Sequence, residues 1–433
     1  MKYAKDFTTR ISSLVKSEEI KNYRKNEKDF TRKRKMGIQQ IICYLLNKKG
    51  LSNKMEIFKF NNLIDVKSIS APAVLKQREK LDPEVFIYLK DEGLKLLYEK
   101  HKEDVKTYKG HLLAGIDGTD LEIPNTEKTR EKYNGKCKDI SCARITMSTM
   151  YDLLNKNTLD TIVMEYNCSE QLMAKEHLKN IESKHGKYPI IRVMDRGYSN
   201  LENIYESGDK DKFVVRIPMS HFKNEINNMK TSDEIIEIGY EYNRAKHYKE
   251  KNQELYNYLS EGKKIKVRVV KIELPTGEIE ILLTNLEKKE FSHEEIEEIY
   301  KLRWNIETNY SYIKESLKIE TITSSKDLLI KQDIHSSILV FNIIQSYINE
   351  SNEKIKQEKY KNKMKINVNM AIGIFKDAFI LVILEEDIKK RTEMMDELQN
   401  TIEKYIVPIK PGRNPKRRTN PKNKYHINKR KSF

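Results

Sequence analysis

Two short apolar segments, each followed directly by an aspartate, constrain the fold of this chain most strongly. Leu112–Ile116 (LLAGI) precedes Asp117, and Tyr188–Met194 (YPIIRVM) precedes Asp195. A glycine follows each carboxylate within two residues, so the backbone can turn sharply at both places. In open α/β sheets, sites form at the carboxyl edge of the strands. The sequence therefore predicts an α/β fold with an acidic site at that edge.

A third carboxylate lies on a predicted helix that includes Tyr300–Lys314 (YKLRWNIETNYSYIK), and a capping box of Ser292 and Glu295 opens this helix upstream. At about 100° per residue, one face carries a tyrosine, two cations and a lone carboxylate, which are Tyr300, Arg303, Glu307 and Lys314. The adjoining arc is apolar and is expected to be buried; it consists of Ile299, Leu302, Ile306, Ile313 and Leu317. Trp304 is expected to pack in the core. On its own, the pattern is also that of a plain amphipathic helix.

Composition favours a helix-rich protein without a membrane partner. The 433 residues are 38% hydrophobic and 34% charged, enough for two or three domains with a substantial core. No apolar run reaches the roughly 18 residues of a membrane span, and the N-terminus lacks an apolar signal region. The four cysteines lack zinc-site spacing; Cys137 and Cys142 are the nearest pair. We expect reduced thiols in a cytoplasmic protein.

The net charge of +17 is concentrated at the two ends of the chain. Residues 1–50 carry +9 and residues 410–433 carry +10, so residues 51–409 are nearly neutral at about −2. Two basic ends on a neutral body indicate a polyanionic partner, with nucleic acid the first candidate. Solubilising tails remain the alternative at this point.

The three carboxylates, Asp117, Asp195 and Glu307, have the chemistry of a site for hard divalent cations such as Mg²⁺. Two such ions about 3.5–4 Å apart can stabilise the attacking and leaving oxygens of an in-line phosphoryl displacement. Carboxylates that share two cations repel one another, so the site is expected to be incomplete without the ions. The sequence contains no P-loop, no histidine pair with zinc-protease spacing and no nucleophile elbow.

Strand-Asp, strand-Asp and helix-Glu, with a Tyr-x₂-Arg-x₃-Glu-x₆-Lys run, resemble the DDE transposases of the insertion-sequence-four type, which have a ribonuclease-H-like fold. The run is matched by Tyr300, Arg303, Glu307 and Lys314, and Asp117-Gly118-Thr119 and Asp195-Arg196-Gly197-Tyr198 are similar to the two aspartate motifs. The resemblance implies that Asp117, Asp195 and Glu307 are catalytic and bind two Mg²⁺ ions, which Mn²⁺ can replace. It implies DNA contacts from Arg303 and Lys314, with Tyr300 beside them. A core or hydrogen-bonded role is an equal alternative for Tyr300, and stacking on a base is the alternative to core packing for Trp304. Arg196 is either a further DNA contact or a structural ion-pair partner.

The resemblance also implies a division of the chain. The expected parts are a helical DNA-binding region (1–105), the first part of the ribonuclease-H-like domain (106–208), a β-rich insertion before the glutamate helix (209–290), the last part of the catalytic domain (291–350), a helical C-terminal region (351–409) and a basic disordered tail (410–433). For the first region, a purely structural helical cap is an equal alternative.

The function implied is that of a bacterial transposase, acting at the nucleoid, which binds the terminal inverted repeats of its insertion sequence. It would cut double-stranded DNA and transfer the strand to target DNA, as a homodimer on paired ends. Two alternatives remain open: a related metal-dependent nuclease without strand transfer, and an inactive remnant that only binds DNA.

Overall fold

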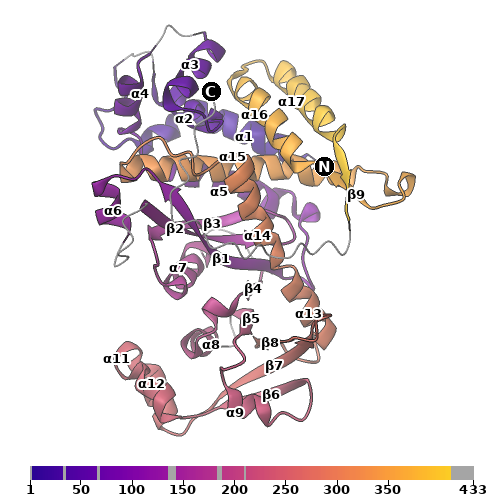
Figure 1. Ribbon diagram of the computed structural model, residues 1–433. Coiled ribbons are helices and arrows are strands. Elements are labelled where there is room, and N and C mark those ends of the chain that lie inside the picture. Colours follow the sequence, from indigo (N-terminus) through magenta and orange to yellow (C-terminus); the bar gives the residue numbers. More distant parts are fainter. Residues whose placement is uncertain are drawn as a thin grey trace.

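The computed structural model describes residues 2–32, 36–65, 69–134, 143–182, 188–208 and 211–410, and it contains a large mixed sheet (Figure 1). The order of its eight strands is β3-β2-β1-β4-β5-β8-β7-β6. The strands are β1 Leu112–Ile123, β2 Ala143–Asp152, β3 Thr158–Glu165, β4 Ile190–Met194, β5 Lys212–Ile217, β6 Asp233–Ile238, β7 Ile265–Glu273 and β8 Ile279–Thr284. A separate pair is formed by β9 Met364–Ile366 and β10 Ile406–Pro408. The predicted mixed α/β class is confirmed.

The centre of the large sheet is parallel and its flanks are antiparallel. β1 pairs in parallel with β4, and β4 in parallel with β5. β2 and β3 extend one side as an antiparallel meander, while β8, β7 and β6 extend the other side. The segment expected as a β-rich insertion therefore continues the central sheet. It also contains short helices that the sequence did not predict, α9 Lys223–Asn227, α10 Tyr242–Lys246, α11 Tyr248–Lys251 and α12 Gln253–Ser260.

One expected strand boundary is wrong. The short apolar strand beginning at Leu112 was expected to end at Asp117, but β1 continues to Ile123. The antiparallel partner β2 explains the extension, because it pairs with β1 from Ala114 through Ile123. Asp117 therefore lies in the middle of a long strand, just where its parallel neighbour β4 ends.

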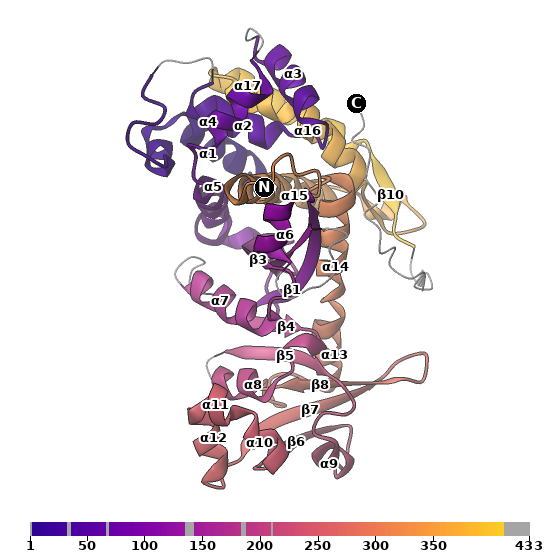
Figure 2. The ribbon, with the colours of Figure 1, turned by 60° about the vertical axis from the view of Figure 1, so that its left-hand side comes forward.

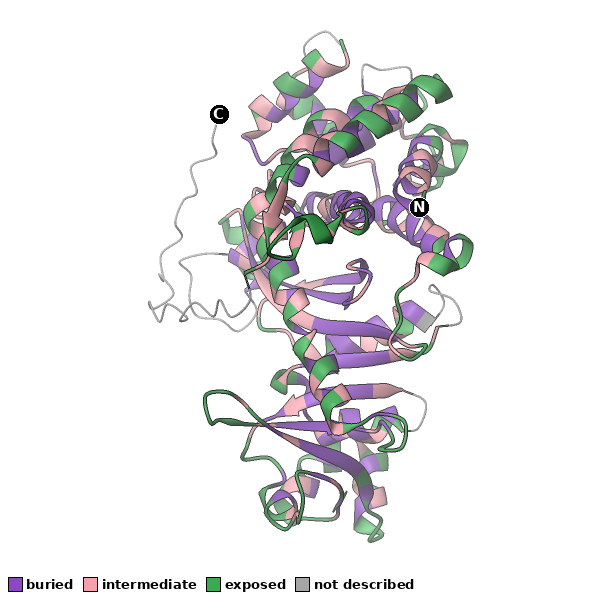
Figure 3. Ribbon diagram, turned by 90° about the vertical axis from the view of Figure 1, so that its right-hand side faces the viewer, coloured by how far each residue is buried: buried purple, intermediate pink, exposed green. Residues whose placement is uncertain are grey.

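Helices from both ends of the chain gather in one layer beside the sheet (Figures 1 and 2). α15 Asp327–Glu353 runs through this layer and is buried on most of its circumference, as Figure 3 also shows. An apolar helix of this kind requires packing on all sides, which the terminal helices supply. They are α1 Tyr3–Lys16, α2 Ile38–Asn47, α3 Asn53–Leu63, α4 Ala71–Arg78, α5 Glu84–Lys95, α16 Val368–Leu384 and α17 Ile388–Glu403.

A buried ion-pair network ties the N-terminal helices to α15. Arg78 of α4 is fully buried and donates to Asp333 of α15 at 2.7 Å, and Lys48 lies 2.8 Å from the same carboxylate. The two cations hold the pKa of Asp333 below its usual range, although burial opposes them. Removal of either cation would leave the buried Asp333 carboxylate without enough positive charge beside it. The network therefore joins these helices and α15 into one packed unit.

Helices also lie against the sheet itself. α7 Glu170–Glu182 contacts β1, β2 and β3, whereas α13 His293–Lys301 and α14 Trp304–Ser311 contact β5, β7 and β1 (Figure 2). α6 Glu127–Tyr133 and α8 Leu201–Ser207 complete the set around the sheet. The predicted capping box of Ser292 and Glu295 is confirmed at the start of α13.

The expected continuous helix through Tyr300–Lys314 is wrong, because a turn separates α13 from α14 at Leu302 and Arg303. There the amide of Arg303 bonds to the carbonyl of Tyr300, and that of Ile306 to the carbonyl of Arg303, each at 3.0 Å. These i→i−3 bonds tighten the helix locally, and a π turn at Tyr312–Ser316 widens its end. The apolar arc is nevertheless buried as predicted, except that Leu302 is only half-buried.

Some sequence predictions fall outside the described residues. These are the basic tail from residue 411 onward, Cys137 and Cys142. Among the helices of the described residues, none is long and apolar enough to span a membrane.

Candidate active site

The sheet register brings the two aspartates together. Ile116 of β1 pairs in parallel with Met194 of β4, so Asp117 and Asp195 follow as neighbours at the end of β4. Both carboxylates therefore lie at the carboxyl end of β4, and the sequence predicted them at the carboxyl edge of the sheet. Asp195 then caps a 3₁₀ turn, accepting a bond from the amide of Gly197 at 2.7 Å, and Asp117 accepts from the amide of Gly118 at 2.9 Å.

Tyr310 attaches the glutamate helix to the strand that carries Asp117. Its hydroxyl donates to the backbone carbonyl of Asp117 at 2.6 Å and accepts from the amide of Thr149 on β2 at 3.2 Å. Asp117 and Thr149 are direct partners in the β1–β2 ladder. Since Tyr310 follows Glu307 by three residues, the contact holds this face of α14 over Asp117.

Arg303 connects Glu307 to the aspartate pair. Its guanidinium is buried, donates to a carboxylate oxygen of Glu307 at 2.8 Å, and is close enough to Asp117 to lower the pKa of that carboxyl. It also lies over two aromatic rings, 5.7 Å from the centre of Tyr300 and 5.4 Å from that of Trp304. The planar guanidinium suits such stacking, so Arg303 is held in one orientation.

The prediction for Trp304 is wrong. This side chain is 54% exposed rather than packed in the core. At about 100° per residue, Trp304 lies roughly opposite the apolar arc that contains Ile306, so even an unbroken helix would expose it. Its indole ring lies 5.4 Å from the guanidinium of Arg303.

The other predicted DNA-contact residues differ in exposure. Tyr300 is buried, and its hydroxyl has no hydrogen-bond partner among the described residues. Lys314 is half-buried, and its ammonium donates to the backbone carbonyl of Asp120 at 2.6 Å. Arg196 is exposed beside Asp195. The structure thus brings Asp117, Asp195, Arg303 and Glu307 together and leaves Arg196 at the surface.

The electrostatics of the site are those of carboxylates held close together. Burial, followed by the charge of Asp195, raises the pKa of Asp117 to about 7, although Arg303 and the amide of Gly118 oppose the rise. Burial and Asp195 also raise the pKa of Glu170, the first residue of α7. Three neighbouring acids thus share one region, and a cation would relieve their repulsion.

The donor set fits a hard divalent cation, since all candidate ligands are carboxylate oxygens. The ligand atoms of Asp117, Asp195 and Glu307 do not all lie within 4.8 Å of one another; among the described residues, only His101, Glu103 and Asp104 meet that distance. His101 is already bonded to Asp6 at 3.0 Å. The ion pair with Arg303, at 2.8 Å, holds the carboxylate of Glu307 in this open arrangement.

Sequence reasoning missed three features of the site. Tyr310 shares a helical face with Arg303 and Glu307, so its spacing could have indicated it. A buried chain from Asp160 through His177 to Ser148 supports the same carbonyl as Tyr310, with contacts of 2.8 and 2.9 Å. Nothing in the local sequence indicates this chain. Glu170, at a helix start directly after a strand, offered only a weak signal.

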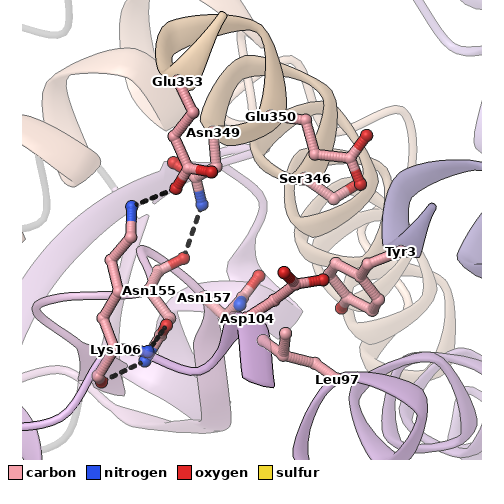
Figure 4. Close-up of a pocket in the computed structure, with 10 residues that line it drawn as sticks. All are labelled: Tyr3, Leu97, Asp104, Lys106, Asn155, Asn157, Ser346, Asn349, Glu350 and Glu353. Atoms are coloured by element: carbon pink, nitrogen blue, oxygen red, sulfur yellow. Dashed lines mark hydrogen bonds and ion pairs between the residues drawn. The ribbon is translucent and has the colours of Figure 1, made fainter. Parts of the chain in front are cut away.

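One hollow adjoins these residues, and a smaller cavity is lined by other parts of the chain. An open, polar hollow of about 440 Å³ adjoins the aspartates and is lined by Gly118, Asp120, Thr146, Ser169, Glu170 and Gly197, among others. Figure 4 shows a smaller cavity, of about 30 Å³, between α1, α15 and the β2–β3 turn. The smaller one is large enough for about two water molecules, so it is not a substrate site.

The sequence matches a known protein family. A family model described as the transposase DDE domain matches residues 108–343, which include all three carboxylates. Among solved structures, a cryo-EM structure of a piggyBac transposase synaptic complex with hairpin DNA is similar over 94% of this chain and 86% of that chain, with 10% sequence identity and a TM-score of 0.45. No curated protein is significantly similar to the sequence. Because the matched segment spans more than half of the chain, the protein belongs to the transposase DDE domain family.

Proposed function

We propose that this protein is the transposase of a bacterial insertion sequence of the insertion-sequence-four type. It binds the terminal inverted repeats of that element as a homodimer on paired ends, then cuts the DNA and joins it to a target. The observation that carries the proposal is the convergence of Asp117, Asp195 and the Arg303–Glu307 pair in a chain of this family.

The central strands support a ribonuclease-H-like catalytic domain, with β6, β7 and β8 as the insertion before the glutamate helix. Asp117, Asp195 and Glu307 would hold two Mg²⁺ ions, with Mn²⁺ as a substitute. When bound, such ions lower the pKa of water and stabilise the charge that develops on the phosphoryl oxygens. Arg303 keeps Glu307 oriented, and Tyr310 fixes the backbone of Asp117.

The reaction consists of two phosphoryl transfers at one site. In the first, a water oxygen bonds to phosphorus, the water loses a proton, and the 3′-oxygen leaves as a hydroxyl. In the second, that 3′-hydroxyl loses its proton and its oxygen bonds to the phosphorus of a target phosphodiester, and the target 3′-oxygen takes up a proton and leaves as a hydroxyl. Neither step needs a covalent bond between protein and DNA, since carboxylates and cations can serve both steps.

Cationic side chains around the site would position the DNA backbone. Arg196 is exposed next to Asp195, and Lys314 follows Glu307 on the next turns. Phosphate contacts of this kind fix the register of the duplex without reading its sequence. The helical N-terminal region and the basic tail would add further DNA contacts.

The test is cleavage of a DNA fragment that carries the gene and its native flanks, with Mg²⁺ or Mn²⁺. Wild type is compared with Glu307→Gln and with Glu315→Gln, a matched control at an exposed position a few residues later. We expect cuts at inverted repeats with wild type and the control, and none with Glu307→Gln. Cleavage that survives Glu307→Gln would refute the proposal.

Two further outcomes identify the alternatives. Cleavage without joining of a labelled end to a plasmid would indicate a nuclease that lacks strand transfer. Binding of the flanks by wild type without cleavage would indicate an inactive DNA-binding remnant.

A further inference from the structure

Glu170 approaches the aspartates from the side of the sheet opposite to Glu307. Successive side chains of β1 point to opposite faces, with Asp117 near Arg303 of the α14 side. The next residue, Gly118, faces Glu170 of α7. Asn167 has a positive φ of 59°, and this left-handed turn leads from β3 into α7. The local backbone therefore places the side chain of Glu170, the first residue of α7, at the site.

Two glycines leave the space that Glu170 occupies. A Cβ at Gly197 would lie 2.0 Å from one carboxylate oxygen of Glu170 and 3.2 Å from an oxygen of Asp195. A Cβ at Gly118 would lie 3.8 Å from the other oxygen of Glu170. The carboxylate thus spans the glycines that follow Asp117 and Asp195, and any larger residue at position 197 would displace it.

No positive group accounts for this position. Among the described residues, the carboxylate of Glu170 has no hydrogen-bond partner and no ion-pair partner, and the charges of Asp195 and Asp120 raise its pKa. The side chain is half-buried and borders the 440 Å³ hollow beside the aspartates. Carboxylates held close together repel one another, and a bound cation relieves that repulsion.

We propose that Glu170 is a fourth carboxylate of the active site and that it binds, together with Asp195, one of the divalent cations. The inference rests on the proposed function, because it adds a ligand to the same site. Hard cations take six or more oxygen ligands, and three carboxylates supply only part of that number. Glu170 provides an additional oxygen donor on the side of the site that Glu307 does not reach.

A purely structural role is the competing explanation. An acidic residue in the first turn of a helix interacts favourably with the helix dipole, so Glu170 would stabilise α7 on that ground alone. The two roles predict opposite effects on the metal-free protein. A structural Glu170 stabilises it, whereas a ligand facing Asp195 destabilises it until the cation binds.

The experiment measures Mn²⁺ binding to the full-length protein by calorimetry, together with Tm without and with Mn²⁺. The variants are Glu170→Gln, which keeps size and removes charge, and Glu176→Gln, a matched control on the same helix whose carboxylate faces Lys179. Asp195→Asn serves as the reference for loss of an expected ligand. The binding and Tm measurements require no DNA, so they are independent of catalysis. The cleavage assay of the proposed function is run separately on the same variants.

We expect Glu170→Gln to weaken Mn²⁺ binding roughly tenfold or more, or to remove one bound ion, while Glu176→Gln binds like wild type. We also expect a higher Tm without Mn²⁺ and a smaller rise when Mn²⁺ is added. Wild-type Mn²⁺ affinity in Glu170→Gln, or a lower Tm of its metal-free form, would overturn the inference. If Asp195→Asn abolishes binding and cleavage while Glu170→Gln changes neither, the inference fails and the proposed function stands. If Asp195→Asn also binds Mn²⁺ and cleaves like wild type, the proposed function itself fails.

Discussion

At the scale of single residues, the two glycines beside the aspartates have different tasks. Both let a carboxylate from α7 approach the site, but only Gly197 is in close contact with it. Neither glycine has a positive φ, so backbone strain does not require either of them. What matters at both positions is the missing side chain. The close contact is at Gly197 and not at Gly118, so substitutions at the two positions should have measurably different effects.

We predict that Gly197→Ala weakens Mn²⁺ binding about as much as Glu170→Gln, because the new methyl group displaces the carboxylate. The displaced group is the end of a flexible side chain, so the free energy of unfolding should change by about 0.5 kcal/mol or less. Gly118→Ala is the matched control, since its Cβ meets only ordinary contacts at 3.8–3.9 Å. Calorimetry and urea denaturation measure both variants. Equal Mn²⁺ affinity for the two would show that the space at position 197 is unimportant.

At the scale of elements, the sequence predicted the features that depend on residues close together in the chain. The capping box at Ser292, the apolar arc of the glutamate helix and the two strands that lead to the aspartates were all predicted from the sequence. The turn at Leu302 and Arg303 was not, because packing imposes it: α13 lies against β5 and β7, while α14 lies against β1. Trp304 was misplaced although the helical period alone puts it on the face opposite the buried arc. Glu170 depends on how α7 folds back across the sheet, which no local pattern encodes.

The docking of α14 on β1 gives a second prediction. Tyr310→Phe removes the hydroxyl that joins the carbonyl of Asp117 to the amide of Thr149, leaving buried backbone groups without that partner. We expect a loss of about 1–3 kcal/mol in the free energy of unfolding. Tyr300→Phe is the matched control, since that buried hydroxyl has no partner in the part of the chain that the structure describes. Urea denaturation should show little or no loss for it. A similar loss in both variants would contradict the role assigned to Tyr310.

The central helix α15 makes stability depend on pH. Burial, followed by the charge of Lys90, lowers the pKa of His335 to about 4, while Lys331 adds to this effect and Asp160 and Asp91 oppose it. His335 is neutral in the folded protein, whereas an unfolded chain takes up a proton near pH 6.5. Its contribution to stability is therefore complete above pH 6.5 and is lost as the pH falls towards 4.

We predict that His335→Gln flattens this part of the pH profile. Between pH 7 and pH 4.5, wild type should lose roughly 2–3 kcal/mol that the variant does not lose. Urea denaturation at the two pH values gives the difference, and the exposed His221→Gln is the control. Equal losses in wild type and His335→Gln would show that another group causes the acid sensitivity.

At the scale of the whole molecule, charge is separated from the packed body. Residues 51–409 are nearly neutral, and the excess positive charge lies in the first 50 residues and after residue 409. The carboxylates of the candidate site belong to the neutral part. The residues proposed to give DNA affinity and those proposed to catalyse the reaction therefore lie in different parts of the chain. Each set can be mutated without the other.

We predict that truncation after Lys410 lowers DNA affinity mainly through electrostatics. The truncation removes nine lysine and arginine residues and no acidic residue. A plot of log affinity against log salt has a negative slope. For every phosphate that the shortened protein no longer neutralises, this slope should become shallower by about 0.9. The measurement is a salt titration of binding to the native flanks and to unrelated DNA, for both proteins. If the tail binds without sequence preference, truncation should lower the affinity for both DNAs by the same factor at low salt. At high salt, the affinities of the truncated and wild-type proteins should become equal. A loss confined to the native flanks would instead assign sequence recognition to the tail, and an unchanged slope would exclude it from the DNA interface.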